Sequence, residues 1–420
     1  MDKQLLAPHI LELEHAIGIS QVPSGLHYHP NGREYLYAVG ASVVITQLAD
    51  LHEQCFLCGH NADICALDVS TSGQLIASGQ RGGNTDAIIW HYDSKSILHR
   101  LSEHDYEVAA LSFSRDELLL CTIGSVDDSK LAIWDVSTGA IVSIVTVASS
   151  SRVCLAWGGM VKDFKQRDTV SYVLCGAFGS NIAVWEVNPF SGEVNEERLS
   201  AEGRGTLHRI VTALDFATDL QTIYCATSSG DVMVVSVCQK IIRSRTMLVS
   251  HSGLTAIEAV QGGLIVGCND GTVTILDASL VRLSRAQLPG AVFSLSVLPN
   301  HHDELLVAVA SGSVHRIRLP DLTQTLLVSD NHSAAVRALA FSGNDSALFS
   351  TASSDCSIRI WDTDDFRAVM TVAVRDAGLP LCLVYTPDVV LSGWTDGKVR
   401  AHDPQNASPL WQIDNAHAKS

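Results

Sequence analysis

The chain has 420 residues and a formal net charge of −17, with 46% hydrophobic and 17% charged residues. This composition excludes a disordered chain and supports a large folded core. With 45 acidic against 28 basic residues, it also argues against a nucleic-acid partner, because phosphate binding needs a clustered Lys/Arg surface.

The first residues contain no signal peptide, and no run approaches the roughly 18 apolar residues of a membrane span. Eleven cysteines are scattered, most of them in apolar runs such as YVLCGA and IVGCN, as expected of free thiols in a reducing compartment. We therefore expect a cytoplasmic protein with no membrane partner.

The chain then follows a period of about 40 residues, in which four short apolar runs alternate with Gly, Asp, Asn and Ser turns. The first unit covers 25–60, and three units around tryptophans follow it. Three later stretches keep the alternation but have no Trp. The tryptophans are Trp90, Trp134 and Trp185, and the degenerate stretches are 232–237, 272–279 and 313–320.

The clearest unit comes late in the chain, and its four apolar runs lie at 335–342, 347–354, 357–364 and 367–374. An aspartate, Asp355, stands six residues before Trp361, in the turn between the second and third runs. The last unit keeps the same offset between Asp396 and His402, with His402 at the position of the Trp.

Nine such units between about Gly25 and His417 predict an all-β propeller of about nine four-stranded blades. We expect one seven-bladed ring over 1–333 and the first two blades of a second ring over 334–420. A closed ring of eight or of nine blades is the alternative. The segment 10–15 is a candidate strand that completes a terminal blade.

The units resemble WD repeats. In that family a His before strand one, a Ser or Thr of strand two, the turn Asp and the Trp form a buried hydrogen-bond network. The best match combines His332, Thr351 or Ser353, Asp355 and Trp361. The resemblance assigns structural network roles to His60, Trp90, His104, Asp128, Trp134, Trp185, Asp270, His332, Asp355, Trp361 and Asp396. His251 and His417 also fit the His position.

We expect these His and Asp residues to be structural, because a buried carboxylate needs the donors that such a network supplies. The sequence has no GxSxG elbow, P-loop or dinucleotide-binding motif, so we predict no catalytic residues, no cofactor and no small-molecule substrate. Cys55, Cys58 and His60 form a CxxCxH pattern, but a zinc site needs four ligands and no second pair follows, so we predict no metal.

The chain further resembles the cilia- and flagella-associated protein 52 family. The similar segments follow one another in order along nearly the whole chain, at 11–31, 35–47, 75–93, 207–216, 262–271 and 391–417. The family has two tandem propellers, so this sequence corresponds to its first two-thirds and lacks the C-terminal third.

The resemblance implies a non-enzymatic scaffold, a microtubule inner protein of axonemal doublets in the cilium or flagellum. Its partners there are tubulin and neighbouring inner proteins in the B-tubule lumen. The alternative is a soluble peptide-binding adaptor, for example in ubiquitin ligation. Such adaptors often carry an arginine cluster at the central channel, but the candidates Arg81, Arg316, Arg318 and Arg359 fall at different strand positions.

Overall fold

The computed structural model describes residues 13–83, 85–147, 152–162, 167–197, 199–201, 209–299, 303–319, 321–328, 331–343, 345–374 and 378–417. These residues form nine sheets in which consecutive strands pair antiparallel. The predicted all-β fold of about nine four-stranded units is therefore confirmed. No helix that is long and apolar enough to cross a membrane occurs in the described part of the chain.

Each of the first four sheets is built of four strands that are consecutive in the sequence. The first contains β1 (His27–Tyr28), β2 (Glu34–Val39), β3 (Ser42–Gln47) and β4 (Gln54–Cys58). The second contains β5 (Ile64–Val69), β6 (Leu75–Gln80), β7 (Thr85–His91) and β8 (Ser96–His104). The third contains β9 (Val108–Phe113), β10 (Leu119–Gly124), β11 (Lys130–Asp135) and β12 (Ile141–Thr146). The fourth contains β13 (Val153–Lys162), β14 (Asp168–Phe178), β15 (Asn181–Val187) and β16 (Val194–Glu197).

The fifth sheet has an additional strand, because β17 (Ser200–Ala201) pairs in parallel with β21. Its other strands are β18 (Val211–Phe216), β19 (Thr222–Thr227), β20 (Asp231–Ser236) and β21 (Ile241–Leu248). The sixth contains β22 (Leu254–Val260), β23 (Gly263–Cys268), β24 (Thr272–Asp277) and β25 (Arg282–Gln287). The seventh contains β26 (Val292–Val297), β27 (Glu304–Val309), β28 (Val314–Arg318) and β29 (Thr323–Val328).

Two sheets complete the fold. The eighth contains β30 (Val336–Ser342), β31 (Asp345–Ser353), β32 (Ser357–Asp362) and β33 (Ala368–Ala373). The ninth contains β34 (Pro380–Thr386), β35 (Val389–Trp394), β36 (Val399–His402) and β37 (Pro409–Ile413). The segment 10–15 was expected to form a strand that completes a terminal blade. Its described part, 13–15, lies in no strand, and 10–12 lie outside the described residues.

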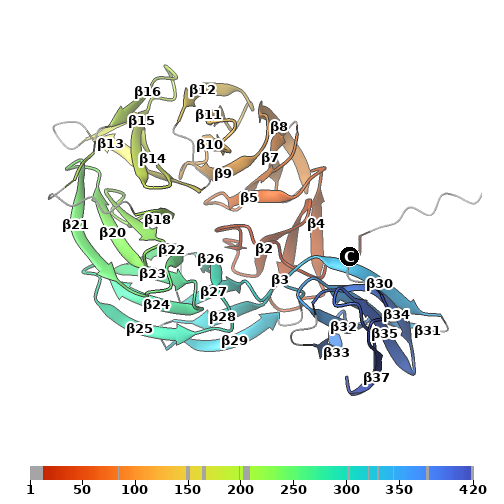
Figure 1. Ribbon diagram of the computed structural model, residues 1–420. Helices are drawn as coiled ribbons and strands as arrows, with labels where there is room; N and C mark the ends of the chain where they lie inside the picture. Colours follow the sequence, from red (N-terminus) through yellow and green to blue (C-terminus); the bar gives the residue numbers. More distant parts are fainter. Residues whose placement is uncertain are drawn as a thin grey trace, which may run out of the picture. The chain divides into compact units, whose positions relative to one another are not determined.

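The chain divides into two compact units. The ring unit comprises Ile19–Ala49 and Leu57–Ala334, and the two-sheet unit comprises the described parts of Met1–Gly18, Asp50–Phe56 and Ala335–Ser420. In the ring unit each of the first six sheets contacts the next, and β26 of the seventh contacts β1 of the first. Figure 1 shows these seven sheets arranged in a circle, with β5, β9, β18, β22 and β26 toward its centre.

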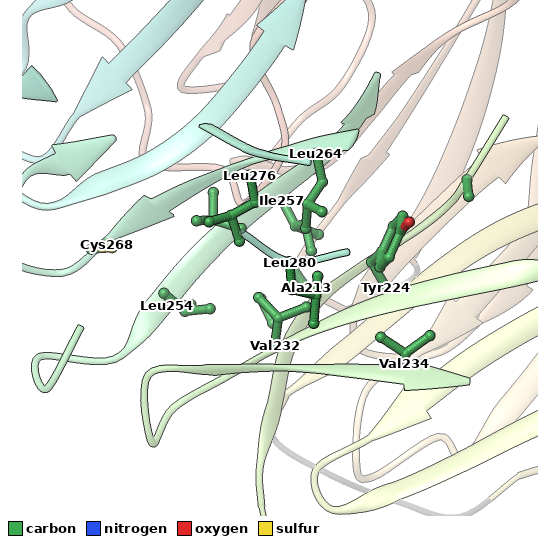
Figure 2. Close-up of a cluster of buried hydrophobic side chains, with 13 residues drawn as sticks. Ala213, Tyr224, Val232, Val234, Leu254, Ile257, Leu264, Cys268, Leu276 and Leu280 are labelled. Carbon is green, nitrogen blue, oxygen red and sulfur yellow. The ribbon is translucent and has the colours of Figure 1, made fainter. Parts of the chain in front are cut away.

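Apolar side chains join neighbouring sheets of the ring. Between the fifth and sixth sheets, for example, Val232 and Tyr224 meet Ile257 and Leu276 in one buried cluster (Figure 2). Middle strands are buried on both faces, as in β11, where Leu131–Trp134 are all buried, whereas the outer strand β12 is half-exposed. This pattern follows from sheets that are covered by neighbours on both sides and exposed only at the outer edge.

The ring closes without a shared strand, because all four strands of the first sheet and all four of the seventh come from contiguous chain. Two backbone N–H groups of the first sheet donate to hydroxyls of β26: Leu26 N to Ser294 Oγ at 3.0 Å and Tyr28 N to Ser296 Oγ at 2.8 Å. Serine side chains thus supply two hydrogen bonds at the closing seam, defined here as the contact of β1 and the residues just before it with β26, and Ser24 N–H donates a third to the Phe293 carbonyl at 3.4 Å.

Candidate functional site

The third sheet contains a complete buried network. The indole Nε1 of Trp134 donates to Thr122 Oγ1 (2.9 Å), and Thr122 Oγ1 lies 2.8 Å from His104 Nε2. His104 Nδ1 bonds Asp128 in the turn between β10 and β11, and both side chains are buried. Burial lowers the pKa of His104 although Asp128 opposes this, so the imidazole is neutral with its proton on Nδ1.

The second sheet builds the same network without a carboxylate. Trp90 Nε1 donates to Ser78 Oγ (2.8 Å), which lies 2.7 Å from His60 Nε2. His60 Nδ1 meets the Gln80 side-chain oxygen at 2.9 Å, and Gln80 in turn donates to Asn61 Oδ1 at 2.7 Å. A carboxamide on strand two thus takes the part that Asp128 has in the third sheet, without placing a charge in the interior.

In the eighth sheet the indole Nε1 of Trp361 donates a hydrogen bond to Thr351 Oγ1 at 2.7 Å. Asp355 accepts from the Ser357 hydroxyl at 2.6 Å and lies 4.0 Å from Arg359 Nη2. Thr351, rather than Ser353, is therefore the strand-two hydroxyl that meets the indole. His332 belongs to the ring unit, whereas the other predicted members of this network lie in the two-sheet unit.

Two predicted positions carry only fragments of the network. In the fourth sheet the strand-two hydroxyl is replaced by Gly176, where a Cβ would lie 2.9 Å from Cζ3 of Trp185, so the indole itself fills the space. In the sixth sheet Asp270 accepts from Ser250 Oγ at 2.9 Å, while the neighbouring His251 is exposed. Burial opposes ionisation of Asp270, but hydrogen bonds from Thr272 and Ser250 outweigh it and lower its pKa to about 2.

The ninth sheet rearranges its network. Asp396 forms a two-bonded ion pair with Arg400, at 3.1 and 2.5 Å, and the guanidinium lies 5.1 Å from the Trp394 ring centroid. Trp394, from strand two, donates its indole N–H to Ser392 at 2.8 Å. His402 stands opposite Val390 at the strand-three position that Trp holds elsewhere, and it is only 4% exposed.

A belt of polar residues, not predicted from the sequence, lines one end of the ring's central channel. Six polar residues and Ala156, one from each first strand, line a cavity of about 460 Å³: His27, Asp68, Ser112, Ala156, Asp215, Glu258 and Ser296. When runs such as CALDVS and VTALDF are aligned as repeats, Asp68 and Asp215 fall at the same position. The sequence does not reveal that this position faces the channel.

The carboxylates of this belt connect neighbouring sheets. Asp68 Oδ2 accepts the backbone N–H of Phe113 in the next sheet at 2.8 Å, and Asp215 Oδ2 accepts that of Ala259 at 2.8 Å. Burial raises the pKa of Asp215 to about 6 and raises the pKa values of Asp68 and Glu258 as well, the last one also through the charge of Asp215. The carboxyl groups of the belt are therefore harder to ionise than exposed ones.

The opposite end of the channel opens into a cavity of about 590 Å³, which includes Arg81 and Arg152. Arg81 lies 3.4 Å from Glu107, so its charge is balanced locally, and Arg316 pairs with Glu304 at 2.5 Å. Two of the arginines considered for phosphopeptide binding, Arg81 and Arg316, are therefore each paired with a glutamate. Among the described residues, no group of three or more His, Cys, Asp or Glu is arranged to hold a metal ion.

Comparisons with known proteins agree with this architecture. The family described as WD domain, G-beta repeat, matches residues 52–91, 95–135 and 323–362. The cilia- and flagella-associated protein 52 of Chlamydomonas reinhardtii is 28% identical, with 98% of this chain and 66% of its own length covered. The Homo sapiens protein of that name is 28% identical over 97% of this chain and 65% of its own length. The chain thus spans about two-thirds of the length of these relatives.

Among solved structures, that of the computationally designed Ika8 protein matches with a TM-score of 0.47 and 21% identity, over 82% of this chain and 96% of that chain. The repeats matched by the WD domain include Trp90, Trp134 and Trp361, three strand-three tryptophans whose indoles bond a strand-two hydroxyl. The chain thus contains repeats that match the WD domain at 52–91, 95–135 and 323–362, and it is similar along nearly its whole length to proteins named cilia- and flagella-associated protein 52.

Proposed function

We propose that this chain is a non-enzymatic scaffold of the cilium or flagellum. The observation that carries the proposal is the extent of similarity to relatives whose name associates them with cilia and flagella, which covers 97–98% of the chain. The networks described above support it, because their imidazoles and carboxylates are used up in bonds to indoles, hydroxyls and guanidinium groups. These networks stabilise the blades, so the ring is better suited to docking a partner than to catalysis.

We further propose that the protein is a microtubule inner protein of axonemal doublets, which binds tubulin and neighbouring inner proteins in the B-tubule lumen. A rigid ring is suited to this role, since many contacts spread over large surfaces bind firmly without a single strongly charged patch. Within it, residues 1–333 are proposed as a seven-bladed propeller and 334–420 as the first two blades of a second one.

Cross-linking mass spectrometry on isolated axonemes tests this placement. With a lysine-reactive reagent we expect cross-links from this chain to lumenal loops of tubulin and to other inner proteins. Cross-links confined to the outer surface of tubulin would contradict a lumenal position. Recovery of a ubiquitin ligase subunit as the main cross-linked partner would instead support the adaptor alternative.

A further inference from the structure

Neighbouring sheets of this protein pack on one another by a repeated rule. We call the face of a sheet that meets the following sheet its forward face, and the other its backward face. In the sixth sheet, Ala256, Val273 and Ile275 belong to the cluster shared with the seventh sheet, whereas Leu264 and Leu276 belong to the cluster shared with the fifth. Such a contact therefore joins the forward face of one sheet to the backward face of the next.

The eighth and ninth sheets follow the same rule. Ala338, Ala352 and Ile360 belong to the forward face of the eighth sheet, and Tyr385 and Val390 of the ninth pack with them in one cluster. Among the described strands, those of the ninth sheet make an extended contact with no sheet other than the eighth. The forward face of the ninth sheet therefore has no following sheet within the described part of the chain.

This open forward face is apolar across all four strands of the ninth sheet. One row of residues stands opposite one another in the strand register: Val384, Leu391, Ala401 and Trp411. Their counterparts on the covered forward face of the eighth sheet are Ala340, Ser350, Ile360 and Met370. Val384 is 55% and Trp411 48% exposed, so the face that a following sheet would cover lies open to solvent.

The backward face of the eighth sheet is open on its first strand. Leu339 and Phe341 of β30 are 56% and 54% exposed, although Trp361 on the same face is buried. In the strand register they hold the places that Leu383 and Tyr385 hold in the ninth sheet, and these two residues pack on the eighth. The eighth sheet thus exposes the counterpart of the surface that covers its own forward face.

The two open faces match each other, but they lie on opposite sides of a packed pair of sheets and cannot meet within one chain. We propose that a second copy of this chain docks with the backward face of its eighth sheet on the forward face of the ninth, so that Leu339 and Phe341 of that copy pack on the row that contains Val384. Because the contact joins two different faces, each copy keeps one open face and further copies can add head to tail. The proposal does not depend on the role in cilia, since it rests on the two-sheet unit alone.

Sedimentation velocity of the full 420-residue chain tests this contact, and we expect a mass that rises reversibly with concentration. Phe341→Lys changes the backward face and Val384→Lys the forward face. Each should weaken self-association by at least about tenfold, because the contact would bury an unpaired lysine. Leu283→Lys, at a 64% exposed position on β25 of the ring unit, is the matched control and should associate like the unchanged chain.

A mixture of the two variants separates this contact from nonspecific association of apolar surfaces. Phe341→Lys keeps its forward face and Val384→Lys its backward face, so the mixture should form a complex of two chains although neither variant associates alone. Leu339→Lys and Trp411→Lys give a second such pair should a variant of the first fail to fold. An unchanged chain that stays monomeric at every concentration, or a mixture of folded variants that forms no complex, would overturn the proposal.

Discussion

In the networks of the second and third sheets, one hydroxyl group connects the imidazole to the indole. Thr122 Oγ1 receives the N–H of Trp134 and, since His104 carries its proton on Nδ1, donates its own hydrogen to His104 Nε2. Each group in this chain of bonds has a single role that no neighbour can take over. The loss of one hydroxyl therefore leaves two buried polar groups unpaired.

Replacement of that hydroxyl by a methyl group tests this dependence. Thr122→Val keeps the shape of the side chain, so we expect the free energy of unfolding to fall by about 1–3 kcal/mol through the unpaired indole and imidazole. Urea denaturation followed by tryptophan fluorescence measures it. Thr325→Val, on the exposed strand β29, is the control and should change stability by less than about 0.5 kcal/mol. Equal effects of the two variants would contradict the network.

The carboxyl groups of the channel make stability depend on pH. The folded-state pKa of Asp215, about 6, exceeds its value in the unfolded chain, so the folded protein holds this proton more tightly. Stability is greatest below the unfolded-state value and falls as the pH rises to about 6. We predict that Asp215→Asn, although less stable overall, loses less free energy of unfolding between pH 4 and pH 6.5, in urea titrations at each pH. A parallel pH profile in both proteins would argue against a raised pKa.

At the scale of the strand and sheet, serine hydroxyls at the closing seam accept hydrogen bonds from backbone N–H groups of the neighbouring sheet. Ser294 and Ser296 accept the backbone N–H groups of Leu26 and Tyr28, and within the described residues no strand is shared between the first and seventh sheets. A shared strand would tie the ends of the ring through a backbone ladder. Here the ring stays closed only as long as the faces of β1 and β26 remain packed.

The double variant Ser294→Ala and Ser296→Ala should therefore destabilise the ring by about 2 kcal/mol or more, because two backbone N–H groups lose their acceptors. Hydrogen exchange followed by mass spectrometry should show faster exchange in β1 and β26 than in β9. Ser284→Ala, on the outer strand β25, is the control and should leave both measurements unchanged. Uniform faster exchange around the ring would show that the seam is not the weak point.

The strands could be predicted from the sequence because their period-two alternation and turn residues are local. The pairing of Trp134 with Thr122 follows from the same repeat, since the register of a four-stranded unit is fixed once its turns are known. The substitution of Gln80 for the turn aspartate could not be predicted, because it brings a strand-two side chain to the position of a loop residue. In the ninth sheet the indole similarly comes from Trp394 of strand two, whereas in other sheets it comes from strand three. Only the fold places this indole beside Arg400.

At the scale of the whole molecule, the two units differ in how much of their apolar surface is covered. In the ring every sheet has a neighbour on each side. In the two-sheet unit, large apolar residues remain about half exposed on the first strands, among them Leu339, Phe341 and Val384. Sheets of this kind are stable when both faces are covered, so the two units should differ in their ability to fold alone.

Separate expression of the two parts tests that difference. We expect a fragment of residues 19–334 to melt cooperatively, with dispersed NMR resonances, because it contains the complete ring of seven sheets. A fragment of residues 335–420 should aggregate or remain unfolded, because its exposed apolar residues have no cover. Cooperative folding of the smaller fragment on its own would contradict the proposal that it is part of a larger ring.

The most direct test of the proposed scaffold role is sequential extraction of axonemes that contain the tagged chain. Detergent removes soluble ciliary protein, salt removes proteins held on the outer surface by charge, and only disassembly of the doublets releases proteins from their lumen. The account predicts that the chain stays with the doublets through detergent and salt and appears only after disassembly. Its release by detergent or mild salt would contradict the account.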